Sequence, residues 1–276
     1  MVPSLIFLRN VIKFSHDQKL PFYILGAGSN VLLSDERVNG IVLKLGGIFK
    51  AISFSNDLSH VSAGGGTSLI KLGNLLAEHG NLGYSYMAVI PGSVGGAIAM
   101  NAGTTNEGEI KDHFVTAQVF DPLTEKINEY GNGEMNFSNR SSSLLKTTNI
   151  VLQASFRLSP VEKRNKELAI QKIKELRSSR QAKQPKNPKT FGSTFKNPKG
   201  QKTAGWYLEK VGMKGMRIGG AMVAPEHANW IVNEGNATSN DVKSLIEIGK
   251  NRVYEEFGIR LQREVIFFPE DIEERV

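Results

Sequence analysis

The sequence predicts an α/β or α+β protein built around open sheets. Short β-rich runs alternate with segments of helical periodicity along the 276 residues, and clusters of glycine separate them. Apolar residues make up 40% of the chain and charged residues 22%, which is typical of a soluble globular protein with a sizeable core. The length suits two modest domains, or one large domain with an appendage.

The first half of the chain alternates strands with glycine turns. The strands expected there lie at residues 22–25, 41–43, 61–63 and 150–158, with a hairpin over 115–130 that turns at Asp121 and Pro122. Leucines at positions 69, 72, 75 and 76 recur at helical spacing and predict a helix over 68–79, which Gly80 ends.

The second half contains more helix. We expect a charged helix over residues 161–180, further helices near 204–211 and over 241–257, and a closing strand over 261–268. Residues 181–189 are rich in Pro, Lys and Asn, a composition that predicts a junction between domains.

The composition excludes several classes of site. The chain contains no cysteine, which excludes disulfides, thiolate metal sites and cysteine nucleophiles and fits a reducing cytoplasm. The five histidines share no metal-ligand spacing, so we predict no metal site. No basic residue precedes the short apolar run at 5–8, which argues against a signal peptide, and the apolar stretch over 87–100 is too interrupted to span a bilayer. We therefore expect a cytoplasmic protein.

The positive charge is concentrated in one segment. Thirteen Lys and Arg residues lie between Lys163 and Lys202, and this segment has a larger positive excess than the whole chain, whose net charge is +7. A solvated helix face, a nucleic-acid patch and a site for an anionic small substrate or nucleotide diphosphate are the three interpretations. The absence of interleaved aromatic residues up to Lys189 and the neighbouring Gly-Ser motif favour the third.

A glycine turn follows the first expected strand. It consists of Gly26, Ala27, Gly28, Ser29 and Asn30. Its glycines permit unusual backbone angles and close approach, and successive backbone N–H groups in such a turn can form an anion nest. The turn lacks the third glycine of the dinucleotide-binding fingerprint. A plain strand–loop turn is the alternative explanation.

A second segment of small residues lies further along the chain. It contains Pro91, Gly92, Ser93, Gly95, Gly96 and Ala97, and Asn101 and Gly103 follow it. Such a segment costs conformational entropy unless a ligand, or a tightly packed helix or sheet, lies against its backbone. Two separated segments of this kind predict a ligand with a diphosphate and an extended body, which describes a dinucleotide cofactor.

Three polar residues are candidates whose residue type alone does not decide their role. Ser193 follows Gly192 without a nucleophile elbow or an evident His or Lys partner, so its hydroxyl is either a proton donor or part of a capped turn. Glu264 precedes the apolar run 265–268 and is either a strand-edge charge or a working acid. Arg140 lies in a polar turn and would by itself be a surface residue.

Taken together, these segments resemble the UDP-N-acetylenolpyruvoylglucosamine reductases, also called UDP-N-acetylmuramate dehydrogenases or the MurB family. The likeness runs from about residue 22 to 268, and its specificity comes from the order and spacing of several motifs. The matching stretches are residues 25–35 (LGAGSNVLLSD), 90–97 (IPGSVGGA), 101–103 (NAG), 177–185 (RSSRQAKQP), 192–198 (GSTFKNP), 204–206 (AGW), 219–221 (GGA), 227–229 (HAN) and 263–265 (REV).

The resemblance implies an α+β protein with a flavin. An FAD-binding domain of the vanillyl-alcohol-oxidase (PCMH) type would occupy residues 1–160, and a smaller α+β substrate-binding domain residues 165–270. FAD and NADPH would be the cofactors, and the substrate would be a UDP-linked enolpyruvyl amino sugar that is reduced for peptidoglycan synthesis. The protein would act as a monomer, without nucleic acid and without membrane insertion.

The resemblance also implies roles for individual residues. Arg140 would hold the substrate carboxylate, Glu264 would be the acid at its edge, and Ser193 would protonate the carbanionic carbon. Lys196, Asn197 and His227 would bind substrate, the first two facing the UDP diphosphate. The two small-residue segments would bind the flavin.

The chain departs from the family pattern in three places. A Thr-x-x-x-Gly-Gly-like signature is missing ahead of the first strand, so the first βαβ unit is expected to be shortened. Asn139 stands where the family usually has Tyr. The short distance from Arg140 to Gly192 leaves little room for the substrate-closing loop of the first class, so the chain resembles the second, loop-less class. Another flavoenzyme of the same fold and a non-enzymatic nucleotide or nucleic-acid binder are the alternatives.

Overall fold

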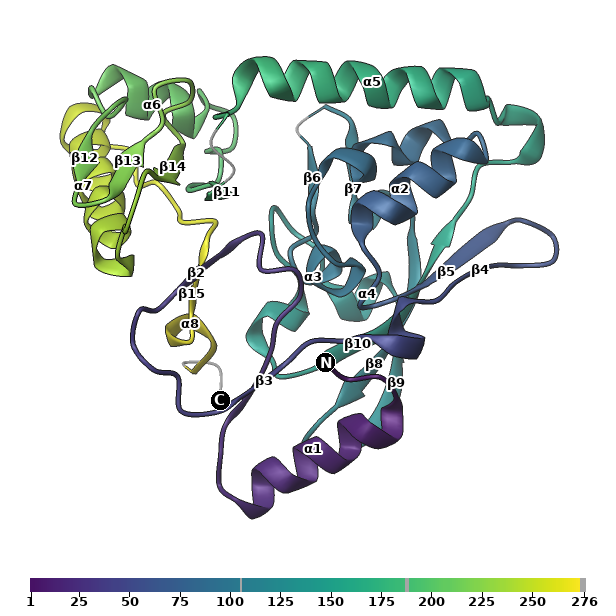
Figure 1. Cartoon of the computed structure of the whole chain (residues 1–276). Helices are drawn as coiled ribbons and strands as arrows, with labels where there is room; N and C mark the ends of the chain where they lie inside the picture. Colours follow the sequence, from purple (N-terminus) through teal and green to yellow (C-terminus); the bar gives the residue numbers. More distant parts are fainter. Residues whose placement is uncertain (105, 187–188, 274–276) are drawn as a thin grey trace. The chain divides into compact units, whose positions relative to one another are not determined.

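The computed structural model describes residues 1–104, 106–186 and 189–273 (Figure 1). Contacts divide the chain into two compact units. The first comprises Met1–Ala27 with Asn39–Arg177, and the second Gly28–Val38 with Ser178–Glu274. Each unit contains its own strands, helices and buried core, so the expected α+β architecture is confirmed.

A five-stranded antiparallel sheet forms the centre of the first unit. Its strands, in spatial order, are β4 (Ile52–Phe54), β5 (His60–Gly64), β10 (Ile150–Arg157), β8 (Phe114–Asp121) and β9 (Lys126–Tyr130). The predicted hairpin over 115–130 and the strand over 150–158 are thereby confirmed. A register shift between Val151 and Gln153 interrupts the alternation of β10, so Ala154 and Phe156 lie in one core cluster and Ile150 and Leu152 in another, and the sheet is covered on both faces.

Helices built from small and leucine-rich segments cover one face of this sheet. They are α2 (Leu69–Glu78), the 3₁₀ helix η2 (Leu82–Val89) and α3 (Val94–Ala99). Leu69, Leu72 and Leu76 of α2 are fully buried, as their spacing predicted. Ser68 caps the start of α2, and Gly80 follows its end with a left-handed φ of +76°.

The start of the chain covers the other face. Ser4 caps α1 (Leu5–Asp17), which buries Leu8 and Ile12 in the second cluster. Val2 forms a parallel bridge with Leu45, and after α1 the strand β1 (Phe22–Ile24) pairs in parallel with β3 (Ile41–Leu43). A strand–helix–strand order is therefore present at the start of the chain. The isolated bridge of Val2 stands in place of the first strand, and α1 and β1 follow it.

Helix α5 (Lys166–Lys183) begins later and ends later than predicted. Pro160 precedes a 3₁₀ turn, η5 (Val161–Lys163), and Asn165 then caps the helix by accepting the N–H of Leu168 at 2.9 Å. Ala169 and Ile173 of α5 pack on Ala77 of α2. Residues 181–183, predicted as part of a junction, belong to this helix.

The second unit is built on a four-stranded antiparallel sheet. Its strands are β11 (Thr190–Ser193), β14 (Trp230–Asn233), β13 (Ala221–Val223) and β12 (Arg217–Ile218), and α6 (Ala204–Lys210) and α7 (Ser239–Phe257) pack with them. The closing strand β15 (Ile266–Phe268) pairs in parallel with β2 (Val31–Leu33) and is shorter than the predicted 261–268, because Arg263 instead bridges Phe195.

Short elements complete the fold: η1 (Gly47–Lys50), β6 (Gly103–Thr104), β7 (Gly108–Glu109), η3 (Ile110–Asp112), α4 (Asn132–Met135), η4 (Ser143–Lys146) and α8 (Glu270–Glu273). None of the helices in the described ranges is long and apolar enough to cross a membrane.

The central sheet of the first unit leads to a prediction about Gly65. Its N–H donates to the carbonyl of Leu152 at 2.8 Å, and an added Cβ would lie 2.0 Å from the carbonyl oxygen of Val151. Gly65→Ala should therefore lower the free energy of unfolding by roughly 3 kcal/mol, by overpacking against backbone. Urea unfolding followed by circular dichroism measures this.

Gly133→Ala is the matched control, because an added Cβ there meets nothing within 4 Å and the residue lies in α4. It should raise the free energy of unfolding by about 0.5 kcal/mol. Equal stabilities of the two variants would contradict the close packing described for Gly65.

Candidate functional site

The first glycine turn packs closely against Ser93 at Gly26 and has open space beside Gly28. A Cβ added at Gly26 would lie 2.5 Å from the hydroxyl of Ser93, so the backbone here passes directly over the second small-residue segment. Gly28 has a left-handed φ of +77° and nothing within 4 Å of the position of a Cβ, and Ala27 is exposed. The turn therefore offers uncovered backbone to a ligand.

The second small-residue segment packs against other parts of the protein and also presents exposed residues. Ser93 caps α3 by accepting the N–H of Gly96 at 3.3 Å, and the N–H of Gly95 donates to the carbonyl of Gly65 at 2.8 Å. These amides are used within the protein, in the tight contact that was the alternative to a ligand. Pro91 and Gly96 are exposed, so the segment still presents surface at both ends.

Asn101 is fully buried with a left-handed φ of 42°. Its Nδ2 donates to Glu109 Oε2 and to the carbonyl of Ser138, both at 3.0 Å, and its Oδ1 accepts the N–H of Lys111 at 3.1 Å. The side-chain amide is thus engaged on both atoms inside the protein. Asn101 braces the loop that carries Arg140.

Arg140 lies in a turn closed by two backbone hydrogen bonds between the ends of residues 138–141, at 3.0 and 3.2 Å. Its own backbone is left-handed, with a φ of 53°. Its Nη2 donates to the carbonyl of Gly103 at 2.7 Å, and Ser142 anchors the far end through a 2.9 Å hydrogen bond to the carbonyl of Ala99. The structure therefore brings Arg140 to Gly103, and the half-buried guanidinium has a defined position.

Ser193 ends β11 and pairs with Trp230 of β14. The ladder shifts register between Thr190 and Ser193, where Gly192 adopts a left-handed φ of +88°. The Ser193 side chain is half-buried, and no hydrogen bond of its hydroxyl is found in the part of the chain that the structure describes. A left-handed residue directly before a serine turns that serine out of the regular strand.

Glu264 pairs through its backbone with the residue after Ser193. Its N–H donates to the carbonyl of Thr194 at 2.8 Å. Its carbonyl accepts a 3.0 Å hydrogen bond from Nδ2 of Asn30, the last residue of the first glycine turn. Glu264 therefore precedes β15 instead of beginning it, and its backbone bonds to Asn30 and to the neighbour of Ser193.

The predicted substrate residues occupy the same unit. The N–H of Lys196 donates to the carbonyl of Gln262 at 2.9 Å, and Asn197 Oδ1 accepts the N–H of Ala204 at 3.0 Å, which caps the start of α6. Lys196 is thus held through its backbone and Asn197 through its side chain. Asn197 has a structural contact that the sequence did not predict.

His227 is held by its neighbour Asn229. The Nδ1 atom accepts the backbone N–H of Asn229 at 3.2 Å, so Nε2 carries the proton of the neutral ring. Burial, with a contribution from the charge of Lys214, lowers the pKa of His227 below its ordinary 6.5. The imidazole is therefore neutral at pH 7 and offers Nε2–H as a donor.

Asn229 itself was not predicted as a site residue. It is 4% exposed, and its backbone and side chain make three hydrogen bonds to residues 194 and 195. A signal was present, because a carboxamide in the otherwise apolar stretch 228–232 must find partners when it is buried. Sequence alone does not identify those partners.

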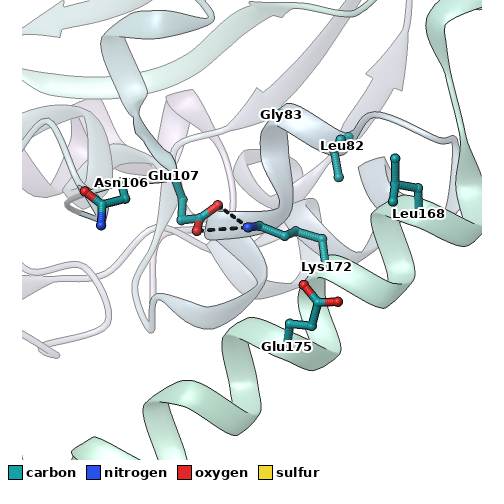
Figure 2. A pocket seen from close by; sticks show the side chains of 7 residues that line it. All are labelled: Leu82, Gly83, Asn106, Glu107, Leu168, Lys172 and Glu175. Carbon is teal, nitrogen blue, oxygen red and sulfur yellow. Dashed lines mark hydrogen bonds and ion pairs between the residues drawn. The ribbon is translucent and has the colours of Figure 1, made fainter.

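A separate cavity of about 310 Å³ lies in the first unit (Figure 2). Residues Leu82, Gly83, Asn106, Glu107, Leu168, Lys172 and Glu175 line it. Lys172 Nζ lies 2.8 and 3.0 Å from the two carboxylate oxygens of Glu107, so the charges there are paired. It contains none of the predicted site residues. Across the described ranges, no group of three or more His, Asp and Glu could hold a metal ion.

Family comparisons match both halves of the chain. Residues 7–127 match the model of an FAD binding domain, and residues 184–268 match the C-terminal domain of UDP-N-acetylenolpyruvoylglucosamine reductase. The two matches contain the two small-residue segments and the region of Ser193 and Glu264, respectively.

Whole-chain relatives carry the same name. The UDP-N-acetylenolpyruvoylglucosamine reductase of Chloroherpeton thalassium is 37% identical over 96% of this chain and 85% of its own length. That of Caldanaerobacter subterraneus subsp. tengcongensis is 39% identical over 94% and 82%. The crystal structure of the Thermus caldophilus reductase covers 97% of this chain and 91% of its own, with a TM-score of 0.81 at 34% identity.

Two half-buried histidines predict how stability depends on pH. Burial lowers the pKa of His113 and of His227 below 6.5, so below that pH the unfolded chain binds protons that the folded protein does not. The free energy of unfolding should therefore fall as pH drops from 7 to 5.5. The lowered pKa values of Asp57, Asp121 and Asp241 lie below the ordinary 3.8, so those carboxylates act outside this window.

Urea unfolding at a series of pH values measures this dependence. His113→Gln and His227→Gln should each remove part of the slope between pH 7 and 5.5. An unchanged slope in the double variant would show that other groups are responsible.

Proposed function

The chain belongs to the UDP-N-acetylenolpyruvoylglucosamine reductases, and on that premise we propose which of its residues carry the reaction. It is a flavin-dependent oxidoreductase that reduces UDP-N-acetylglucosamine enolpyruvate to UDP-N-acetylmuramate in peptidoglycan precursor synthesis, with FAD and NADPH as cofactors. The expectations from sequence for family, fold, activity and cofactors are confirmed.

We assign residues 1–160 to FAD binding and 165–270 to substrate binding. The family matches over 7–127 and 184–268 support this division. The contacts of the fold group Gly28–Val38 with the second unit, so the end of the first glycine turn and β2 would accompany the substrate domain.

The residues of the two small-residue segments fit a flavin dinucleotide. Open space beside Gly28 and the exposed backbone of Ala27 and Gly96 suit a long ligand that lies against main chain. We propose that Gly26–Asn30, Pro91–Ala97, Asn101 and Gly103 form the FAD site, with Asn101 acting through the loop that it braces. When bound, FAD transfers a hydride from NADPH to the enolpyruvyl double bond.

Arg140 would stabilise the charge that this reduction creates. Hydride adds to the vinyl methylene carbon and leaves negative charge on the carbon next to the carboxylate, from which it spreads into an enolate-like group. A fixed guanidinium at that carboxylate stabilises the charge without reorganisation. The 2.7 Å hydrogen bond from Arg140 to Gly103 supports this role, because it holds the cation in place before substrate arrives.

Ser193 would supply the proton that completes the reduction. The intermediate is a much stronger base than water, so a serine hydroxyl can serve as general acid. Glu264, in its protonated form, would hydrogen-bond to the substrate carboxylate. The observation that supports this proposal is the hydrogen bond between the N–H of Glu264 and the carbonyl of Thr194, because it pairs the segment that contains Glu264 with the segment that contains Ser193.

The remaining proposals concern substrate binding, cellular location and oligomeric state. Lys196, Asn197 and the basic stretch before Ser193 would face the UDP diphosphate, and the neutral His227 would donate Nε2–H to the substrate. The absence of cysteine and the use of NADPH and a sugar nucleotide favour the cytoplasm. We propose a monomer of the loop-less class that does not bind nucleic acid.

One spectroscopic experiment tests the proposed function. The purified protein, supplemented with FAD, is mixed anaerobically with NADPH and then with the enolpyruvyl sugar nucleotide. Flavin absorbance should bleach with NADPH and return with the sugar. Absorbance that returns only with oxygen would indicate an oxidase on the same fold, and protein that binds DNA but no flavin would indicate the non-enzymatic alternative.

Ser193→Ala should separate the two half-reactions. Flavin bleaching by NADPH should keep its rate, and reoxidation by the sugar nucleotide should slow roughly 100- to 10,000-fold, which is the usual contribution of a general acid. Stopped-flow absorbance measures both steps. Ser244→Ala, at an exposed position of α7, is the control and should change neither rate. Equal losses in both half-reactions of Ser193→Ala would overturn the assignment.

Arg140→Gln should act on the sugar half-reaction through charge. Without the fixed positive charge of the guanidinium, kcat/KM for the sugar nucleotide should fall roughly 100- to 1,000-fold. The NADPH half-reaction should keep its rate. Lys126→Gln removes one positive charge from the exposed strand β9 and controls for net charge. Steady-state kinetics at constant ionic strength distinguish them, and similar effects of the two variants would contradict a local role of Arg140.

A further inference from the structure

The sheet alone does not hold Ser193 in one orientation. Gly192 interrupts the ladder directly before it with a φ of +88° and has nothing within 4 Å of a Cβ position. The regular pairing of β11 with β14 ends at Ser193 and Trp230. A serine that follows a left-handed glycine at a register shift needs an anchor on its other side to have a fixed hydroxyl position.

Asn229 supplies that anchor through three hydrogen bonds. Its backbone carbonyl accepts the N–H of Thr194 at 2.8 Å. Its side-chain Oδ1 accepts the N–H of Phe195 at 2.9 Å, and its Nδ2 donates to the carbonyl of Phe195 at 2.8 Å. The residue is 4% exposed, so these bonds are shielded from water and their loss would leave buried backbone groups unpaired.

The residues that Asn229 anchors also pair with the segment that contains Glu264. The carbonyl of Thr194 accepts the N–H of Glu264, and Arg263 bridges Phe195. Asn229 therefore bonds to the same two residues, Thr194 and Phe195, with which the segment of Arg263 and Glu264 pairs. A shift of the Thr194–Phe195 backbone would move the Ser193 hydroxyl relative to the carboxyl group.

We propose that Asn229 is a positioning residue that aims the Ser193 hydroxyl at one face of the carbanionic carbon. The inference rests on the proposed role of Ser193 as proton donor. Hydride converts the methylene into a methyl group, the electron pair of the double bond remains on the adjacent carbon, and the serine proton bonds to that carbon. Because the carbon becomes a stereocentre, the face that receives the proton decides the configuration of the product.

Asn229→Ala tests the inference beside a matched control. Asn233→Ala removes the same carboxamide at the end of β14, the strand that begins directly after Asn229; its Oδ1 accepts the N–H groups of Gly235 and Ala237 at 2.9 and 3.2 Å, away from residues 194 and 195. Asn229→Ser is the second variant, because its hydroxyl retains one hydrogen-bonding group if the alanine variant fails to fold. Flavin content and melting temperature establish that each variant is folded.

The readouts are the two half-reactions and the configuration of the product formed in D₂O. In Asn229→Ala the NADPH step should be unchanged, the sugar step should slow roughly 10- to 100-fold, as misplacement by about 1 Å does, and the opposite epimer should become detectable by NMR. Asn229→Ser should give the same changes to a smaller extent, and Asn233→Ala should give neither.

Several outcomes overturn the inference. If Asn229→Ala or Asn229→Ser loses both half-reactions in parallel, or behaves as Asn233→Ala does, Asn229 has a general structural role. If Ser193→Ala, measured alongside, leaves the sugar step fast, the proposed donor is wrong and the inference falls with it. A slow sugar step in Ser193→Ala with a fast, stereospecific one in Asn229→Ala overturns the inference while the proposed function stands.

Discussion

The hydrogen bonds of Thr194 hold together the part of the candidate site that lies in the second unit. The N–H of Thr194 bonds to Asn229 and its carbonyl to Glu264, so two segments far apart in sequence meet on one residue. Such bonds gain little net energy each, but a buried backbone group without its partner costs about 1–3 kcal/mol. The geometry of donor and acid therefore depends on backbone pairing more than on side-chain contacts between them.

In the first unit, close packing of the backbone organises the candidate residues. Gly65 lies against the carbonyl of Val151, and Gly26 against Ser93, so the surface beside the small-residue segments is made of main chain. Asn101 and Arg140 then tie the loop over residues 138–141 to the stretch that follows α3. In each unit the candidate residues thus lie on loops whose backbone is anchored, which fits a protein that must position a long cofactor and a sugar nucleotide.

Sequence reasoning predicted the elements whose periodicity is strong and the residues that belong to motifs. The leucine spacing of α2 and the alternation of β10 required no tertiary information. The start of α5 was missed because Asn165 was not recognised as its cap, and β15 is shorter than predicted because a bridge to Phe195 replaces part of the ladder. Asn229 was missed because its partners are 34 residues away, a distance that local patterns do not reach.

One residue of the candidate site holds a backbone conformation that is unfavourable for its type. Arg140 has a φ of 53°, where a residue other than Gly, Asn or Asp is strained by roughly 1 kcal/mol or more. Glycine at position 140 would relieve that strain and remove the guanidinium at once. Under the role proposed for Arg140, selection for thermostability alone would favour a better-folded and less active enzyme at this position, a trade-off between stability and activity that is confined to one turn.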